Sequence, residues 1–158
     1  MLATFNLYTL SLFVHIAAAV VGLGASFALA VGFPLAIRLG DRYLPFVHQL
    51  SLEVTRKLAS PALLVLIVTG LYQGIDADRM DEPWIGATFA IAIALGALQG
   101  AYFIPTDRKL SARAEQELSA GGLTDEYRQQ AQREGAMGVA AGLLIVVAVF
   151  LMVTQPGA

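Results

Sequence analysis

The chain has 158 residues, of which 57% are hydrophobic and 14% charged, and its mean hydropathy is +0.67. These values lie outside the usual range of soluble domains and predict an integral membrane protein. The formal net charge is −2, and we expect no nucleic-acid partner. The sequence contains no cysteine, which excludes disulfides, thiolate catalysis and thiolate metal sites.

Four apolar segments are long enough to cross a hydrocarbon core about 30 Å thick, which takes roughly 20 helical residues. The first, at about 6–35, has no basic residue before it, so it is predicted to be a retained helix and not a signal peptide. The other spans are expected at about 58–75, within a longer helix 44–75, at 84–104 and at 135–154. The predicted fold class is therefore all-α: an integral membrane antiparallel four-helix bundle in a single domain, 1–158.

The basic residues indicate the orientation. Nine of the ten lie in the connections 36–57 and 105–134. Positive loops stay in the cytoplasm, so we expect both termini outside (N-out/C-out), in a bacterial-type inner membrane and in contact with the lipid bilayer. The connection 105–134 is polar and helix-forming on both sides of Gly121-Gly122, with Thr124 placed as an N-cap. It predicts a cytoplasmic helical hairpin, interpreted as a solvated extension of the spans.

Small residues recur at four-residue spacing, which lets helices approach closely in a membrane. Helix packing within one chain is the simpler interpretation of these faces, and a homodimer is the alternative. The faces comprise Ala18, Gly22, Ser26 and Ala30 in the first span, Gly96 and Gly100 in the third, and Gly138 and Gly142 in the fourth.

His15 is the ionisable residue within the spans, and it shares a helix face with Ala18 and Gly22. A rise of about 1.5 Å per residue places it about 15 Å from the outer surface, where a polar group needs a partner or a function. A neutral imidazole bonded to a hydroxyl or carbonyl is one interpretation. A metal ligand, a haem-iron ligand or a proton carrier is the other.

His48 is the second histidine, and the same rise separates it from His15 by about 25 Å along the membrane normal. One iron therefore cannot bind both. We interpret His48 as a cytoplasmic surface or interface residue. Gln99 is expected to donate an interhelical hydrogen bond. The spans contain no Asp, Glu, Lys or Arg, which argues against ion pumping.

The chain resembles HemJ-type membrane proteins, and the resemblance extends to CopD-like copper-resistance membrane domains and to uncharacterised four-helix membrane protein families. The resemblance covers nearly the whole chain. It rests on "LFVHIAAAVVGLGASF", "TRKLASPALLVLIVTGLYQG", "PWIGATFA" and "RQQAQREGAMGVAAGLLIVVAVFLMVTQP", in that order. It implies that haem b binds through His15, with Ala18, Ala19 and Gly22 leaving room for the macrocycle.

The sequence departs from the HemJ-type pattern at three positions. Gly22 lies near the place of a tryptophan, Thr88 replaces a lysine, and Gln99 replaces a histidine. We therefore do not expect protoporphyrinogen oxidase activity. Two alternatives to haem remain. One is a cofactor-free membrane bundle with a structural, interaction or small-molecule-binding role; the other is copper handling through Met80, Met137 and Met152.

Overall fold

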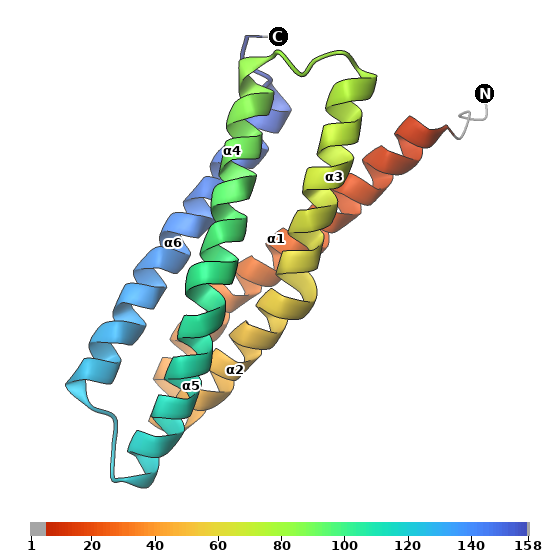
Figure 1. The fold of residues 1–158 in the computed structure, drawn as a ribbon. Coiled ribbons are helices and arrows are strands. Elements are labelled where there is room, and N and C mark those ends of the chain that lie inside the picture. Colours follow the sequence, from red (N-terminus) through yellow and green to blue (C-terminus); the bar gives the residue numbers. More distant parts are fainter. Residues whose placement is uncertain (1–5, 158) are drawn as a thin grey trace.

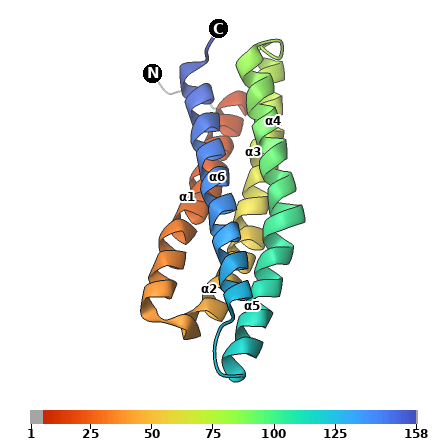
Figure 2. The ribbon, with the colours of Figure 1, turned by 90° about the vertical axis from the view of Figure 1, so that its left-hand side faces the viewer.

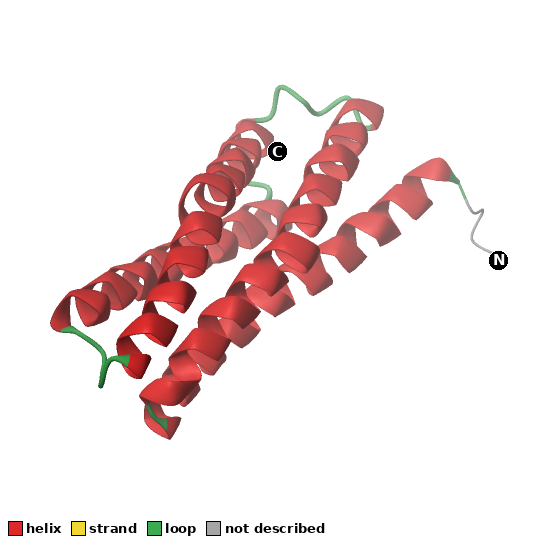
Figure 3. Cartoon of the chain, turned by 60° about the horizontal axis from the view of Figure 1, so that its bottom comes forward, coloured by secondary structure: helices red, strands yellow, loops and turns green. Residues whose placement is uncertain are grey.

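Residues 6–157, which the computed structural model describes, form four helical rods (Figure 1). All four are long and apolar enough to cross a membrane. They confirm the predicted all-helical four-helix architecture, and the described residues include no strand (Figure 3). In chain order the elements are α1 (Leu7–Leu39), the 3-10 turn η1 (Asp41–Tyr43), α2 (Leu44–Val54), the π-helical turn η2 (Thr55–Ala59), α3 (Ser60–Asp76), α4 (Pro83–Leu98), the π-helical turn η3 (Gln99–Phe103), α5 (Ile104–Ser119) and α6 (Asp125–Thr154).

The start of α1 and the end of α6 lie at the same end of the bundle, here called the terminal end (Figures 1 and 2). The connection between α5 and α6 lies at the other end, the hairpin end. Gly121 and Gly122 have φ values of 116° and 149°, a backbone region that side chains disfavour. Thr124 then caps α6, because its hydroxyl oxygen accepts a hydrogen bond from the backbone N–H of Tyr127 at 3.2 Å. The hairpin closes at the residues that the sequence indicates.

Close packing in the apolar part of the bundle occurs where α1 meets α3. A Cβ atom added to Gly22 would lie 2.7 Å from the Cβ of Ala62, so the two helices touch there. Ala18 is buried on the same face of α1. By contrast, a Cβ added to Gly138 or Gly142 would meet nothing within 4 Å among the described residues. The first small-residue face therefore packs within the chain as predicted, whereas the pair on α6 does not.

Most large apolar side chains of the spans point outward. Phe13, Val20 and Val153 are 67%, 69% and 76% exposed. In water such exposure would be unfavourable, but lipid chains solvate these residues as well as a protein interior does. The exposed side chains therefore form the surface that contacts the bilayer.

The two π-helical turns lie next to each other. The hydroxyl of Ser60, which follows η2, donates a hydrogen bond of 2.9 Å to Oε1 of Gln99, the first residue of η3. Gln99 thus makes the predicted interhelical bond, but as acceptor and not as donor. A π turn holds more residues than an α turn and so changes the phase of the side chains that follow it. Beyond these turns, α2 and α5 extend side by side to the hairpin end.

The hairpin end contains a hydrophobic core of its own. α5 packs along α2, and the end of α1 and the start of α6 complete the group. Leu110, Ala114 and Tyr127 are at most 1% exposed. The hairpin was predicted to be a solvated extension of the spans. This prediction is wrong for the face of the hairpin that packs against α2 and the end of α1. The core consists of Ala36, Leu44, Val47, Leu110, Ala114 and Tyr127.

Candidate metal centre

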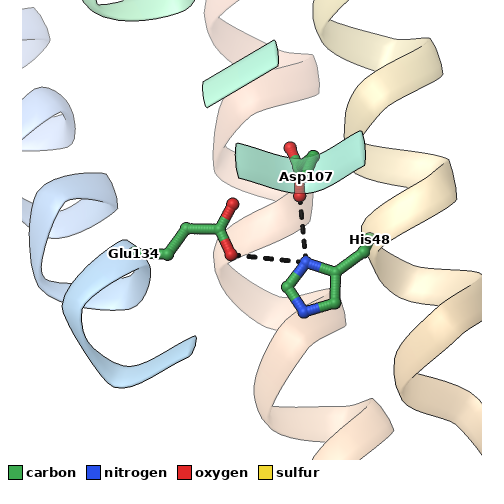
Figure 4. Close-up of side chains that lie close together, drawn as sticks. All are labelled: His48, Asp107 and Glu134. Carbon is green, nitrogen blue, oxygen red and sulfur yellow. Dashed lines mark hydrogen bonds and ion pairs between the residues drawn. The ribbon is translucent and has the colours of Figure 1, made fainter. Parts of the chain in front are cut away.

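Three buried ionisable side chains meet beside this core, each from a different helix (Figure 4). His48 comes from α2, Asp107 from α5 and Glu134 from α6, and their relative exposures are 1%, 0% and 5%. One ligand atom from each lies within 4.8 Å of the others. We call these three residues the His48 cluster.

Helical periodicity brings the cluster together. Spacings of three and four residues place His48 and Ser51 on the buried face of α2, and Asp107 and Ser111 on the buried face of α5. The hydroxyl of Ser111 donates to the backbone carbonyl of Pro45 at 3.1 Å, which fixes α5 against the start of α2. Tertiary packing between these faces therefore sets the positions of His48 and Asp107.

The imidazole of His48 is held at both nitrogens. Nδ1 lies 3.0 Å from Oδ1 of Asp107, and Nε2 lies 3.0 Å from the hydroxyl of Tyr127. An ionised carboxylate can only accept, so in this arrangement Nδ1 carries a proton and donates it to Asp107. Phe33 packs against the ring at a centroid distance of 5.1 Å, nearly edge to face. These contacts fix the orientation of the imidazole.

Both oxygens of Asp107 have donors. Oδ1 accepts from His48, and Oδ2 accepts from the hydroxyl of Ser51 at 2.6 Å. Buried carboxylates need such donors, because burial removes the water that would otherwise solvate them. Ser51 therefore orients the carboxylate so that Oδ1 faces the imidazole.

Glu134 has no comparable donor. Its Oε2 lies 3.3 Å from Nδ1 of His48, but neither carboxyl oxygen receives a hydrogen bond from the described residues. The Nδ1 proton is directed at Asp107 and so does not satisfy Glu134. Glu134 immediately precedes the apolar run 135–154, and burial, together with the Asp107 carboxyl, raises the pKa of Glu134. An unpartnered buried polar group costs about 1–3 kcal/mol, which points to a binding partner for this carboxyl.

The two carboxyl groups of the cluster share one basic partner among the described residues, His48. Across residues 6–157, the ion pairs of Asp107 and Glu134 involve His48 alone. Two arginines of the hairpin pair with other acids: Arg113 with Glu117 and Glu126, and Arg128 with Asp41. Two carboxyl groups and one imidazole, with no Lys or Arg partner in the part of the chain that the structure describes, form a set of oxygen and nitrogen donors suited to a metal cation.

Of the two positions predicted for His48, cytoplasmic surface or interface, the surface one is wrong. The side chain is 1% exposed, because α5 packs along α2 and Tyr127 and Glu134 of α6 reach the imidazole. The pattern of buried residues was readable in the sequence, because Leu44, His48, Ser51 and Thr55 recur at helical spacing. The partners of His48 were harder to find, because Asp107 and Glu134 lie far along the chain.

His15 lies in a separate polar contact between α1 and α3. Its Nδ1 is 2.8 Å from the hydroxyl oxygen of Thr69, and that hydroxyl donates to the carbonyl of Val65 at 2.6 Å. Because the only hydroxyl proton is used, Nδ1 of His15 must donate to Thr69, which leaves Nε2 with the lone pair in a neutral ring. This is the hydroxyl partner that one interpretation of the sequence expected.

The room expected beside His15 is largely taken by α3. Gly22 contacts Ala62, and the ring of His15 lies against Gly70, where an added Cβ would be 3.3 Å from Cε1 of His15. The cavity that Gly22 lines holds about 20 Å³, roughly the space of one water molecule. Ala19 is half-buried. At Gly22, α3 therefore occupies the space that a haem between α1 and α3 of a single chain would need.

Comparison with known proteins agrees with this architecture. The family model described as "Predicted integral membrane protein (DUF2269)" matches residues 9–156. The chain belongs to this family. The match spans all four helical rods and includes His15 and every residue of the His48 cluster. A search of the curated proteins and a search of the solved structures found no match.

Proposed function

We propose that this member of the family binds a divalent transition-metal ion at the His48 cluster. The observation that carries the proposal is the carboxyl group of Glu134, which is buried and has no hydrogen-bond donor among the described residues. It lies beside a second buried carboxyl group and an imidazole, and no Lys or Arg of residues 6–157 pairs with either acid.

A divalent ion would allow both acids to ionise. In the metal-free protein the raised pKa of Glu134 favours its protonated form, because burial and the nearby Asp107 carboxyl oppose a second negative charge, whereas a doubly charged cation would compensate both carboxylates. Imidazole nitrogen with carboxylate oxygen suits zinc, manganese or ferrous ions better than it suits magnesium or calcium, which prefer oxygen alone. His48 Nδ1, Asp107 Oδ1 and Glu134 Oε2 are the atoms that would hold the ion.

The positive-inside rule supports a cytoplasmic position for this site. Nine of the ten basic residues lie in the connections 36–57 and 105–134, which include the hairpin end, so we propose that this end faces the cytoplasm and that both termini lie outside, in a bacterial-type inner membrane. The cluster would then lie at the inner boundary of the bilayer, within reach of the cytoplasmic pool of metal ions.

Zinc binding to the purified protein in detergent tests the proposal. After treatment with a chelator, the wild-type protein should bind one zinc ion per chain in isothermal titration calorimetry, and Glu134→Gln and His48→Ala should bind it at least 10-fold more weakly. Glu53→Gln is the matched control, because Glu53 lies on α2 and pairs with the exposed Lys57. Wild-type protein that binds no zinc, or equal affinity in all four proteins, would refute the proposal.

Haem binding through His15 is the second candidate. One observation favours it: the bond to Thr69 protonates Nδ1 and leaves Nε2 available as a ligand, as in sites where a second contact fixes the tautomer. Within one chain the helix contact at Gly22 opposes it, so this candidate requires α1 and α3 to separate or a haem between two copies. It predicts a Soret band in haem-replete protein that His15→Ala removes and His48→Ala leaves.

The other sequence-based hypotheses receive less support. A homodimer through Gly138 and Gly142 stays a prediction. A Cβ added at either glycine meets nothing within 4 Å among the described residues, so this face of α6 has room for a second helix. For copper handling, the donors of the His48 cluster are oxygen and nitrogen, whereas copper(I) favours thioether or thiolate sulfur. A cofactor-free bundle predicts that neither histidine affects metal content.

A further inference from the structure

Tyr127 lies where it can decide which nitrogen of His48 is available to a metal ion. It is 1% exposed, belongs to α6, and places its hydroxyl 3.0 Å from Nε2 of His48. The ring planes of Tyr127 and His48 are nearly perpendicular, at 88°. The hydroxyl therefore contacts the ring nitrogen that the two carboxyl groups do not.

The carboxyl groups both face the other nitrogen. Asp107 Oδ1 and Glu134 Oε2 lie 3.0 Å and 3.3 Å from Nδ1, so an ion held by both acids is adjacent to Nδ1 (Figure 4). Nδ1 can coordinate the ion only through its lone pair, and a neutral imidazole then carries its proton on Nε2. That Nε2–H needs an acceptor in a buried site, and the hydroxyl of Tyr127 is the polar atom within reach.

We propose that Tyr127 is a positioning residue for the metal centre: its hydroxyl accepts the Nε2–H of His48 and so presents the Nδ1 lone pair to the ion. The inference rests on the proposed metal function. Without metal, Nδ1–H donates to Asp107 and the tyrosine hydroxyl donates to Nε2. With metal, the imidazole proton lies on Nε2 and the hydroxyl becomes the acceptor. A hydroxyl can play both parts, and a phenyl ring can play neither.

The chain offers a simple readout, because it contains two histidines. Nitrogen-15 NMR of histidine-labelled protein in detergent distinguishes a protonated from an unprotonated ring nitrogen, and a His15→Gln variant assigns the signals of His48. On addition of zinc, we expect the proton of His48 to move from Nδ1 to Nε2. The proton of His15 should stay on Nδ1, because Thr69 still accepts from it.

The functional test is Tyr127→Phe, which keeps the ring in the hydrophobic core and removes only the hydroxyl. We expect zinc affinity to fall 10- to 100-fold, the usual effect of losing a partner that orients a metal-bound histidine. Tyr72→Phe is the control, because its hydroxyl lies at the terminal end, 3.4 Å from Asp76. Circular dichroism of the metal-free variant checks that Tyr127→Phe remains folded, and the NMR tautomer of His48 provides a readout that lost packing alone would not change.

The outcomes separate the two claims. If the wild-type protein binds no zinc, the proposed function fails and this inference fails with it. If the wild-type protein binds zinc but Tyr127→Phe binds equally well, or His48 keeps its proton on Nδ1 in the zinc complex, the inference alone is overturned. Weaker binding of Tyr127→Phe, with the proton on Nε2 in the wild-type complex, supports it.

Discussion

Gly22→Ala should destabilise the bundle because α1 has no room for a side chain at that position. An added Cβ would lie 2.7 Å from the Cβ of Ala62, well inside the usual carbon–carbon contact of about 3.5–4.0 Å. The helices must therefore move apart by about 1 Å, or Ala62 must shift within a packed interface. Overpacking of this kind typically costs about 1–3 kcal/mol.

Gly24→Ala is the matched control, because the same substitution two residues along α1 meets nothing within 4 Å. Alanine favours helix over glycine by up to about 1 kcal/mol, so this variant should be neutral or slightly more stable than the wild-type protein. The free energy of unfolding is measured by titrating the detergent-solubilised protein with sodium dodecyl sulfate and following helix content. Equal stability of the two variants would refute the close α1–α3 contact, and with it the argument that a haem does not fit beside Gly22.

Three further predictions concern the hairpin end. Ser51→Ala removes the donor to Oδ2 of Asp107 and should weaken zinc binding 10- to 100-fold in calorimetry. Ser119→Ala, which removes an exposed hydroxyl, is the control and should leave zinc affinity unchanged. Equal zinc affinities of the two variants would contradict the role given to Ser51. Thr124→Ala removes the cap of α6 and should lower the free energy of unfolding by about 1 kcal/mol, and no loss would show that the cap contributes nothing. Because folding raises the pKa of Glu134, the folded protein holds this proton more tightly than the unfolded chain, so metal-free stability should fall as pH rises above the ordinary glutamate value of 4.5. Glu134→Gln should reduce this pH dependence. If the free energy of unfolding of Glu134→Gln falls with pH above 4.5 as steeply as that of the wild-type protein, Glu134 is not the group responsible.

The sequence predicts the four helices because their apolar runs are long and separated by charged connections. Thr124 and the pair Gly121-Gly122 also mark where α6 begins and the hairpin turns, since capping and positive φ depend on local chemistry. The π-helical turns carried no comparable signal. They depend on how α2–α3 packs against α4–α5, as the Ser60–Gln99 bond illustrates.

The candidate site was only partly predictable. The helical rise predicts that His48 and His15 lie apart, and the two make contacts with different residues. Depth, however, does not reveal which residues of other helices lie at the same level. Asp107 and Glu134 stand 59 and 86 positions after His48, in segments whose polar composition suggested solvent. Their convergence follows from helix pairing, which one sequence read by its periodicity does not specify.

Anomalous diffraction at the zinc absorption edge tests the central claim most directly. Crystals of the wild-type protein grown with zinc should show an anomalous peak between the side chains of His48, Asp107 and Glu134, in contact with Nδ1 of His48. Crystals of Glu134→Gln grown in the same way should lose it. A wild-type map without a peak at this position, at a zinc concentration that occupies other sites on the protein, would contradict the account.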